Sequence, residues 1–165
     1  MELREQLLAL MLWLSVIGQS TWVGGTLYQM LVIVPVWSAS PPESVRSFFQ
    51  STDYNRLISR FFGPSFLAAW TLPVVLALVA GWHLPSHRGP LILAVSCLLF
   101  AVIYTLAYVH PIGAVLFEKA GGSESDDEIR AMTTRWIQAD QLRFVVGVVA
   151  FLAILWTFRL PIGPE

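Results

Sequence analysis

The chain has 165 residues, of which 56% are hydrophobic and 13% charged, and its mean hydropathy is +0.65. Soluble domains carry about 25% charged residues, so this composition excludes an ordinary soluble protein. The formal net charge of −1 and the scattered basic residues exclude a nucleic-acid-binding surface. A single cysteine, Cys97, excludes an intramolecular disulfide and any redox motif that needs two cysteines.

Four apolar segments are long enough to cross a hydrocarbon core of about 30 Å, which takes about 20 helical residues. They cover residues 7–34, 61–82, 90–117 and 141–158. The first is uncharged and exceeds the apolar part of a signal peptide, about 7 to 15 residues, so we interpret it as an uncleaved span. The sequence predicts an all-α, integral membrane four-helix bundle that forms one domain over residues 1–165.

The connections between these segments are unequal. The connections after spans 1 and 3 are long, and we expect amphipathic helices at the membrane interface in both. In the first connection they are two short pieces over residues 43–50 and 53–62, and in the second residues 126–135 begin the next helix. Spans 2 and 3 are joined by the short turn 83–89. The long connections carry more arginine and lysine than the side with the termini, so the positive-inside rule places them in the cytoplasm. The expected location is a bacterial inner membrane.

Polar residues within the first span lie at helical spacing. Gly18, Trp22, Gly25 and Gln29 share one face, and Tyr28 lies one turn after Gly24. Small residues allow helices to approach closely, and a glutamine supplies an interhelical hydrogen bond. This face is therefore expected to pack against another helix or a second copy of the chain, whereas Gln29 and Tyr28 can equally line a pocket.

Span 4 carries a second polar stripe, formed by Trp136, Asp140, Arg143 and Gly147 at positions i, i+4, i+7 and i+11. Asp140 and Arg143 are close enough on a helix to form an ion pair. One interpretation is a salt-bridged helix end with an interfacial tryptophan. The other is that Arg143, oriented by Asp140, presents a cation at the mouth of a cavity.

Span 3 contains Tyr108 and His110 just before Pro111, which opens or kinks a helix. His110 falls in the same half of the bilayer as Arg60 and Arg143. A polar residue at that depth is tolerated where it faces the bundle or a wet cavity. We therefore expect either a polar-lined pocket on the loop side or a structurally satisfied histidine.

The sequence predicts no metal and no cofactor. His83 and His87 have i, i+4 spacing, but Pro85 lies between them in a turn, and no Cys/His cluster accompanies them. No nucleotide-binding fingerprint or nucleophile elbow is present.

Four segments, "GGTLYQMLVIVPVW", "RFFGPSFLAAW", "YVHPIGAVLF" and "RWIQADQLRFVVGVVAF", together resemble the anthrone-oxygenase-like family of small membrane proteins. The resemblance extends over nearly the whole chain. It implies a four-helix bundle. For members with an assigned activity, it also implies the oxidation by dioxygen of an electron-rich polycyclic aromatic, an anthrone, without a dedicated metal or flavin.

The resemblance carries over to Tyr28, Arg60, His110, Trp136 and Arg143. Oxygenation without a cofactor needs a base that forms the substrate enolate and a cation that stabilises it. On this interpretation His110 is the base, and Arg143 or Arg60 stabilises the anion. The residues expected to bind the substrate are Tyr28, Gln29, Tyr108, Trp136 and Asp140, with Trp22 and Trp70 as further pocket walls.

Other functions remain open. "TWVGGTLYQMLVIVP" also resembles the copper-resistance-D-type membrane domains, but the chain has few residues that pass copper. The same polar residues fit the binding of a lipid or a quinone. An alternative from another class is a non-catalytic subunit or assembly factor of a larger membrane complex, in which Asp140 and Arg143 satisfy each other.

Overall fold

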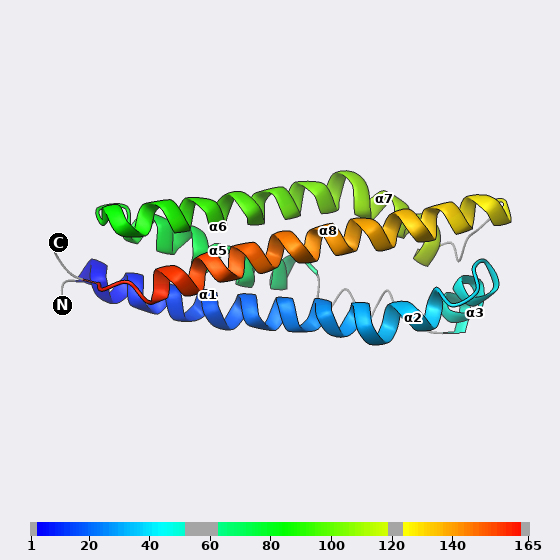
Figure 1. The fold of residues 1–165 in the computed structure, drawn as a ribbon, viewed down its shortest axis with the longest axis horizontal. Helices are drawn as coiled ribbons and strands as arrows, with labels where there is room; N and C mark the ends of the chain where they lie inside the picture. The colour runs from blue at the N-terminus through cyan, green and yellow to red at the C-terminus, as the bar shows by residue number, and fades with distance from the viewer. Residues whose placement is uncertain (1–2, 52–62, 119–123, 163–165) are drawn as a thin grey trace. The chain divides into compact units, whose positions relative to one another are not determined.

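A computed structural model describes residues 3–51, 63–118 and 124–162. Within these ranges all regular structure is helical (Figure 1). The elements in chain order are α1 (Leu3–Tyr28), η1 (Gln29–Ile33), α2 (Val34–Trp37), α3 (Glu43–Ser51), α5 (Pro64–Ala80), α6 (Pro85–Tyr104), η2 (Thr105–Val109), α7 (His110–Gly113), η3 (Ala114–Glu118) and α8 (Asp126–Phe158), where η denotes a π-helical segment.

Three continuous helical stretches, Leu3–Trp37, Pro85–Phe117 and Asp126–Phe158, are long and apolar enough to cross a membrane. They coincide with predicted spans 1, 3 and 4 and indicate an integral membrane protein. The second predicted span corresponds to α5, whose apolar part, Leu67–Ala80, is shorter. The first residues of that span lie outside the described part of the chain. The all-α class is confirmed for the described residues, and the four-helix bundle stays a prediction.

The predicted amphipathic helices have different outcomes. A short helix, α3, forms in the first long connection, and its location at the membrane interface stays a prediction. The second part of that connection lies outside the described residues. In the other connection residues 126–135 begin a helix as expected, and that helix is α8, which continues to Phe158. Its location at the membrane interface stays a prediction. At 33 residues, α8 is about 50 Å long, so it is longer than a hydrocarbon core is thick.

The N-terminus of α8, which precedes the predicted span 141–158, is closed by side-chain hydrogen bonds. The Ser125 backbone N–H and hydroxyl donate to Glu128 Oε2 at 2.9 and 2.8 Å, and the Glu128 N–H donates back to Ser125 Oγ at 3.4 Å. This is a capping box, which satisfies backbone donors that a helix leaves unpaired in its first turn. The hydrogen bonds from Ser125, led by that from its backbone, lower the pKa of Glu128.

Two prolines inside the long helices each follow a π-helical segment. Segment η1 ends two residues before Pro35, and η2 ends two residues before Pro111. A proline has no N–H to donate, and its ring clashes with the carbonyl four residues earlier. The wider π turn accommodates this: the N–H of Val34 donates to the carbonyl of Gln29, five residues back, and His110 donates in the same way to Thr105. The opening predicted at Pro111 therefore takes the form of a π turn.

The chain divides into two compact units, and the long helices contribute to both. Unit 1 contains residues 1–24, 64–101 and 145–165, and unit 2 contains residues 25–63 and 102–144. Each has a core of its own. In unit 1, apolar side chains of α1, α5, α6 and α8 form two clusters that include Leu12, Leu91 and Ile154.

The glycine face predicted in span 1 makes contacts inside unit 1. Trp22 is buried against Gly147 of α8, so closely that a Cβ at position 147 would lie 1.9 Å from the indole ring. Gly18 lies against Trp70 of α5, and the Gln19 side-chain amide donates to the Trp70 carbonyl at 2.8 Å. Gly18 and Trp22 thus pack helices of the same chain, the first of the two interpretations given for this face.

Candidate functional site

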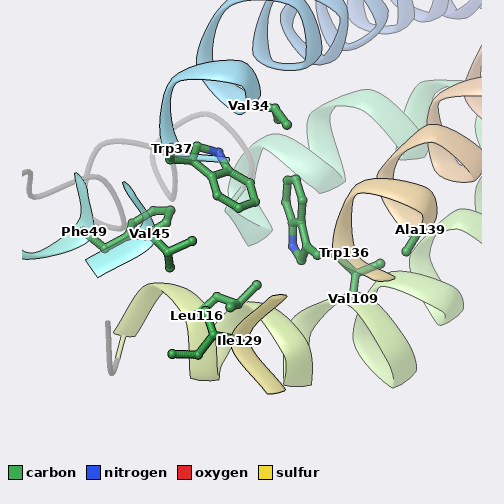
Figure 2. Packing of buried hydrophobic residues seen from close by; sticks show 9 residues of the cluster. All are labelled: Val34, Trp37, Val45, Phe49, Val109, Leu116, Ile129, Trp136 and Ala139. Carbon is green, nitrogen blue, oxygen red and sulfur yellow. The ribbon is translucent and has the colours of Figure 1, made fainter. Parts of the chain in front are cut away.

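The core of unit 2 is aromatic. Figure 2 shows Trp37 of α2 and Trp136 of α8 against each other, with Phe49 of α3 beside Trp37. The ring centroids of the two tryptophans are 5.3 Å apart, and those of Phe117 and Trp136 are 5.2 Å apart. All these pairs are tilted or edge to face, which aromatic quadrupoles favour. Trp37, Phe49, Phe117 and Trp136, hereafter the aromatic cluster, hold α2, α3, η3 and α8 together.

A buried ion pair follows the aromatic cluster along α8. Asp140 lies one turn after Trp136, and Arg143 lies three residues further on the same face. Arg143 Nη2 donates to Asp140 Oδ1, and Arg143 Nη1 donates to Thr105 Oγ1 of η2 at 3.4 Å. The Asp140 side chain is 1% exposed and that of Arg143 is 11% exposed. Two opposite charges are thus held out of water, and removing each of them from water costs several kcal/mol.

Further polar atoms in unit 2 are buried without a hydrogen bond to any described residue. Among them are Asp140 Oδ2, Gln29 Oε1 and Thr26 Oγ1. All three can accept a hydrogen bond. A buried acceptor without a donor costs about 1–3 kcal/mol, so such groups are uncommon outside sites that a ligand, ion or water completes. Unit 2 therefore contains buried acceptors that could bind a hydrogen-bond donor.

Gln29 lies at about the same level of unit 2 as the ion pair. Trp37 contacts Trp136, and the η1–α2 stretch runs opposite to this part of α8 (Figure 1). Gln29 lies eight residues before Trp37, which is about 12 Å along the helix. Arg143 lies seven residues after Trp136, which is about 10.5 Å along α8. Gln29 and Thr105 are also the first residues of η1 and η2. Both π segments thus place a polar residue at the level of the ion pair, in keeping with the frequent occurrence of π turns at functional sites.

The comparison with known families matches residues 53–153 to the family described as anthrone oxygenase. The chain belongs to the anthrone oxygenase family. The match confirms the resemblance inferred from the sequence, and it includes the ion pair, Thr105 and Trp136. Nothing among the curated proteins and no solved structure matches the chain.

The structure places several predicted site residues of this anthrone oxygenase family member together in the interior of unit 2. Trp136 is in the aromatic cluster, and Asp140 and Arg143 form the ion pair. Gln29, expected either to contact another helix or to line a pocket, is buried. The stripe predicted in span 4 is therefore a buried stripe, while the roles of its residues in binding or catalysis stay predictions.

Other predicted site residues lie at the surface of the chain. Tyr28 is 59% exposed and Tyr108 is 42% exposed, although Tyr108 stacks on Tyr104 with ring centroids 5.3 Å apart. His110 is also exposed and makes no hydrogen bond through its ring to another described residue. Arg60 lies outside the described residues. Trp22 and Trp70, expected as pocket walls, belong to unit 1 and not to the aromatic cluster.

Sequence reasoning missed three residues of this site. Thr105 lies between Tyr104 and Tyr108, Thr26 lies between Gly25 and Leu27, and Trp37 lies beyond the end of the first predicted span. A signal existed for each threonine, since a hydroxyl in an apolar span either bonds its own backbone or serves a site. For a metal, no three His, Cys, Asp or Glu side chains gather within ligating distance in the described ranges.

Proposed function

We propose that the protein binds a hydrophobic aromatic or phenolic molecule beside the aromatic cluster and the Asp140–Arg143 pair, and that it oxygenates this molecule with dioxygen. The observation that carries the proposal is the buried ion pair, which lies one turn from Trp136 in a membrane-type helix of an anthrone oxygenase family chain. A cation kept out of water on the helix that carries Trp136 suits an aromatic ligand that becomes an anion.

The reaction is the conversion of a methylene next to aromatic rings into a carbonyl. A base removes one proton, and the electron pair stays on the ligand as an enolate. Dioxygen then adds at that carbon. One oxygen atom stays as the carbonyl oxygen, and the other leaves as water with the two hydrogens of the methylene. Dioxygen is the only oxidant that this balance needs.

Arg143 is suited to stabilise the enolate, because its guanidinium donates in a plane and stays protonated. Arg60 is the second candidate for this role, and His110 is the base that the family resemblance assigns. Gln29 and Trp136 are proposed to contact the ligand from inside unit 2, and Tyr28 and Tyr108 from its surface. The long connections of unit 2 are proposed to face the cytoplasm, because they carry more arginines than the side with the termini.

A specific observation favours the non-catalytic alternative. Asp140 and Thr105 already engage Arg143, as expected if the pair only supports the fold of a subunit or assembly factor. The two functions differ in whether the arginine is needed for a ligand or only for stability. They can be separated with purified protein.

The test is native mass spectrometry of the detergent-purified protein, with oxygen uptake measured after adding anthrone. Arg143→Ala is compared with Arg130→Ala, whose arginine forms an exposed i, i+3 pair with Asp127 on the same helix and donates to the Pro41 carbonyl at 3.1 Å. We expect a bound aromatic molecule and oxygen uptake in wild type and Arg130→Ala, and neither in folded Arg143→Ala. If wild type carries only lipid and consumes no oxygen with anthrone, the oxygenase proposal is refuted and protein partners are the next object of study.

A further inference from the structure

The two carboxylate oxygens of Asp140 have different surroundings. Oδ1 accepts a hydrogen bond from Arg143, whereas Oδ2 is buried and accepts none from a described residue. If Asp140 served only to neutralise Arg143, the most stable arrangement would be a bidentate pair, in which both carboxylate oxygens accept hydrogen bonds from the guanidinium. The side chain is 1% exposed, so bulk water does not supply a donor to Oδ2.

We infer that Asp140 is the group that takes the proton from the ligand, with Arg143 then pairing with the anion that forms. This inference rests on the proposed function and goes beyond it, since the family resemblance assigns the base to His110. The C–H bond breaks, an O–H bond forms at Oδ2, and the electron pair remains on the ligand. The proton held by Asp140 later leaves in the water that carries the second atom of dioxygen.

The balance of charge favours Asp140 over a neutral histidine. Before the transfer the site holds one anion, Asp140, and one cation, Arg143. After the transfer it holds the ligand anion and the same cation, so the number of charges is unchanged. Transfer to a neutral imidazole would instead create an additional pair of charges, and each ion removed from water costs several kcal/mol. In a membrane interior, exchanging one anion for another is the less costly course.

The placement of Asp140 also suits this role. Arg143, which is 11% exposed, is the less buried member of the pair, and its guanidinium contacts the Asp140 carboxylate, so a ligand anion that pairs with Arg143 would lie beside that carboxylate. A base acts within hydrogen-bond reach or through one water molecule, and its contacts tighten when the substrate binds. Gln29 Oε1, an acceptor at the same level, can hold a ligand hydroxyl.

The experiment is an anaerobic absorbance titration of the full-length protein in detergent with anthrone, whose enolate absorbs at longer wavelength than the neutral molecule. The variant is Asp140→Asn, and the control is Asp127→Asn. Asp127 is the first member of the exposed Asp-x-x-Arg pair on the same helix, so the control removes the same charge from the same kind of pair. Oxygen uptake is then measured in air.

We expect wild type and Asp127→Asn to bind anthrone as the enolate at neutral pH. Asp140→Asn should bind it in the neutral form and consume oxygen about 100-fold more slowly, or slower still. Enolate formation by Asp140→Asn at the wild-type level would overturn the inference, and loss of the enolate only in His110→Ala would assign the base to His110. If wild type binds no anthrone, the proposed function itself is refuted.

A measurement on wild type covers the case in which Asp140→Asn does not fold. Infrared difference spectra on adding anthrone should show a protonated carboxylic acid that shifts in D₂O. If anthrone binds as the enolate and no such band appears, the proton has gone to another group and the inference is wrong.

Discussion

Replacing Gly147 with alanine tests the closest helix contact in unit 1. The Cβ of an alanine there would lie 1.9 Å from Cζ3 and 2.5 Å from Cη2 of Trp22. Carbon atoms in contact are about 3.5–4.0 Å apart, so the indole or one of the helices has to move by roughly 1.5 Å or more. Trp22 is buried, and these two atoms belong to a rigid ring, so rotating a flexible side chain cannot relieve the clash.

The size of the effect depends on two opposing contributions. Overpacking a core costs about 1–3 kcal/mol, and a contact this short favours the upper part of that range. Alanine in place of glycine inside a helix stabilises by about 0.5–1 kcal/mol. Gly147→Ala should therefore lower the free energy of unfolding by about 1–2 kcal/mol. For a chain of this size that corresponds to a decrease in Tm of roughly 2–8 °C.

The assay is thermal unfolding in a mild detergent, followed by tryptophan fluorescence. Gly24→Ala in α1 is the matched control, because a Cβ there meets nothing within 4 Å. The control should be as stable as wild type or more so. Adding Trp22→Leu to Gly147→Ala should recover part of the loss. Equal stability of Gly147→Ala and Gly24→Ala would show that the contact between Trp22 and Gly147 is not as close as described.

Two further predictions concern α8. Arg143→Gln should destabilise the protein by about 3–5 kcal/mol, because it leaves Asp140 buried and uncompensated. Arg130→Gln, at the exposed pair, should destabilise it by less than about 1 kcal/mol. Equal losses of stability in unfolding experiments would contradict the burial of the Asp140–Arg143 pair. The hydrogen bonds from Ser125 lower the pKa of Glu128. The capping box therefore stabilises the folded protein at pH values above the ordinary glutamate pKa, and this stabilisation is lost as the pH falls through the lowered pKa. Glu128→Gln should therefore flatten the acid side of the stability profile, and an unchanged profile would argue against the box.

Much of the fold could be predicted from composition and periodicity. A span has to be apolar over its whole length, so four spans could be predicted, and three of them correspond to long apolar helices. The spacing of Asp140 and Arg143 was enough to predict their pairing. Residues at helical spacing on the faces of Gln29 and Trp136 are buried or half-buried. The family assignment also followed from short sequence segments.

The remaining features depend on contacts between segments distant in sequence. The π turns before Pro35 and Pro111 add a residue to a helical turn and rotate the residues after it, so a period of 3.6 no longer gives the faces. His110 lies directly after η2, and its exposure could not be inferred from spacing. Thr105 became part of the site only when a separate helix brought Arg143 to it.

The position of both charges on one helix bears on how the protein enters the membrane. Asp140 and Arg143 are three residues apart, so their pair can form as soon as α8 is helical, before any other segment is in place. A single charged residue at the centre of an inserting helix costs about 2.5–3.5 kcal/mol. Pairing offsets part of this for both residues during insertion, so the translocation machinery would meet a segment that is close to neutral at that depth.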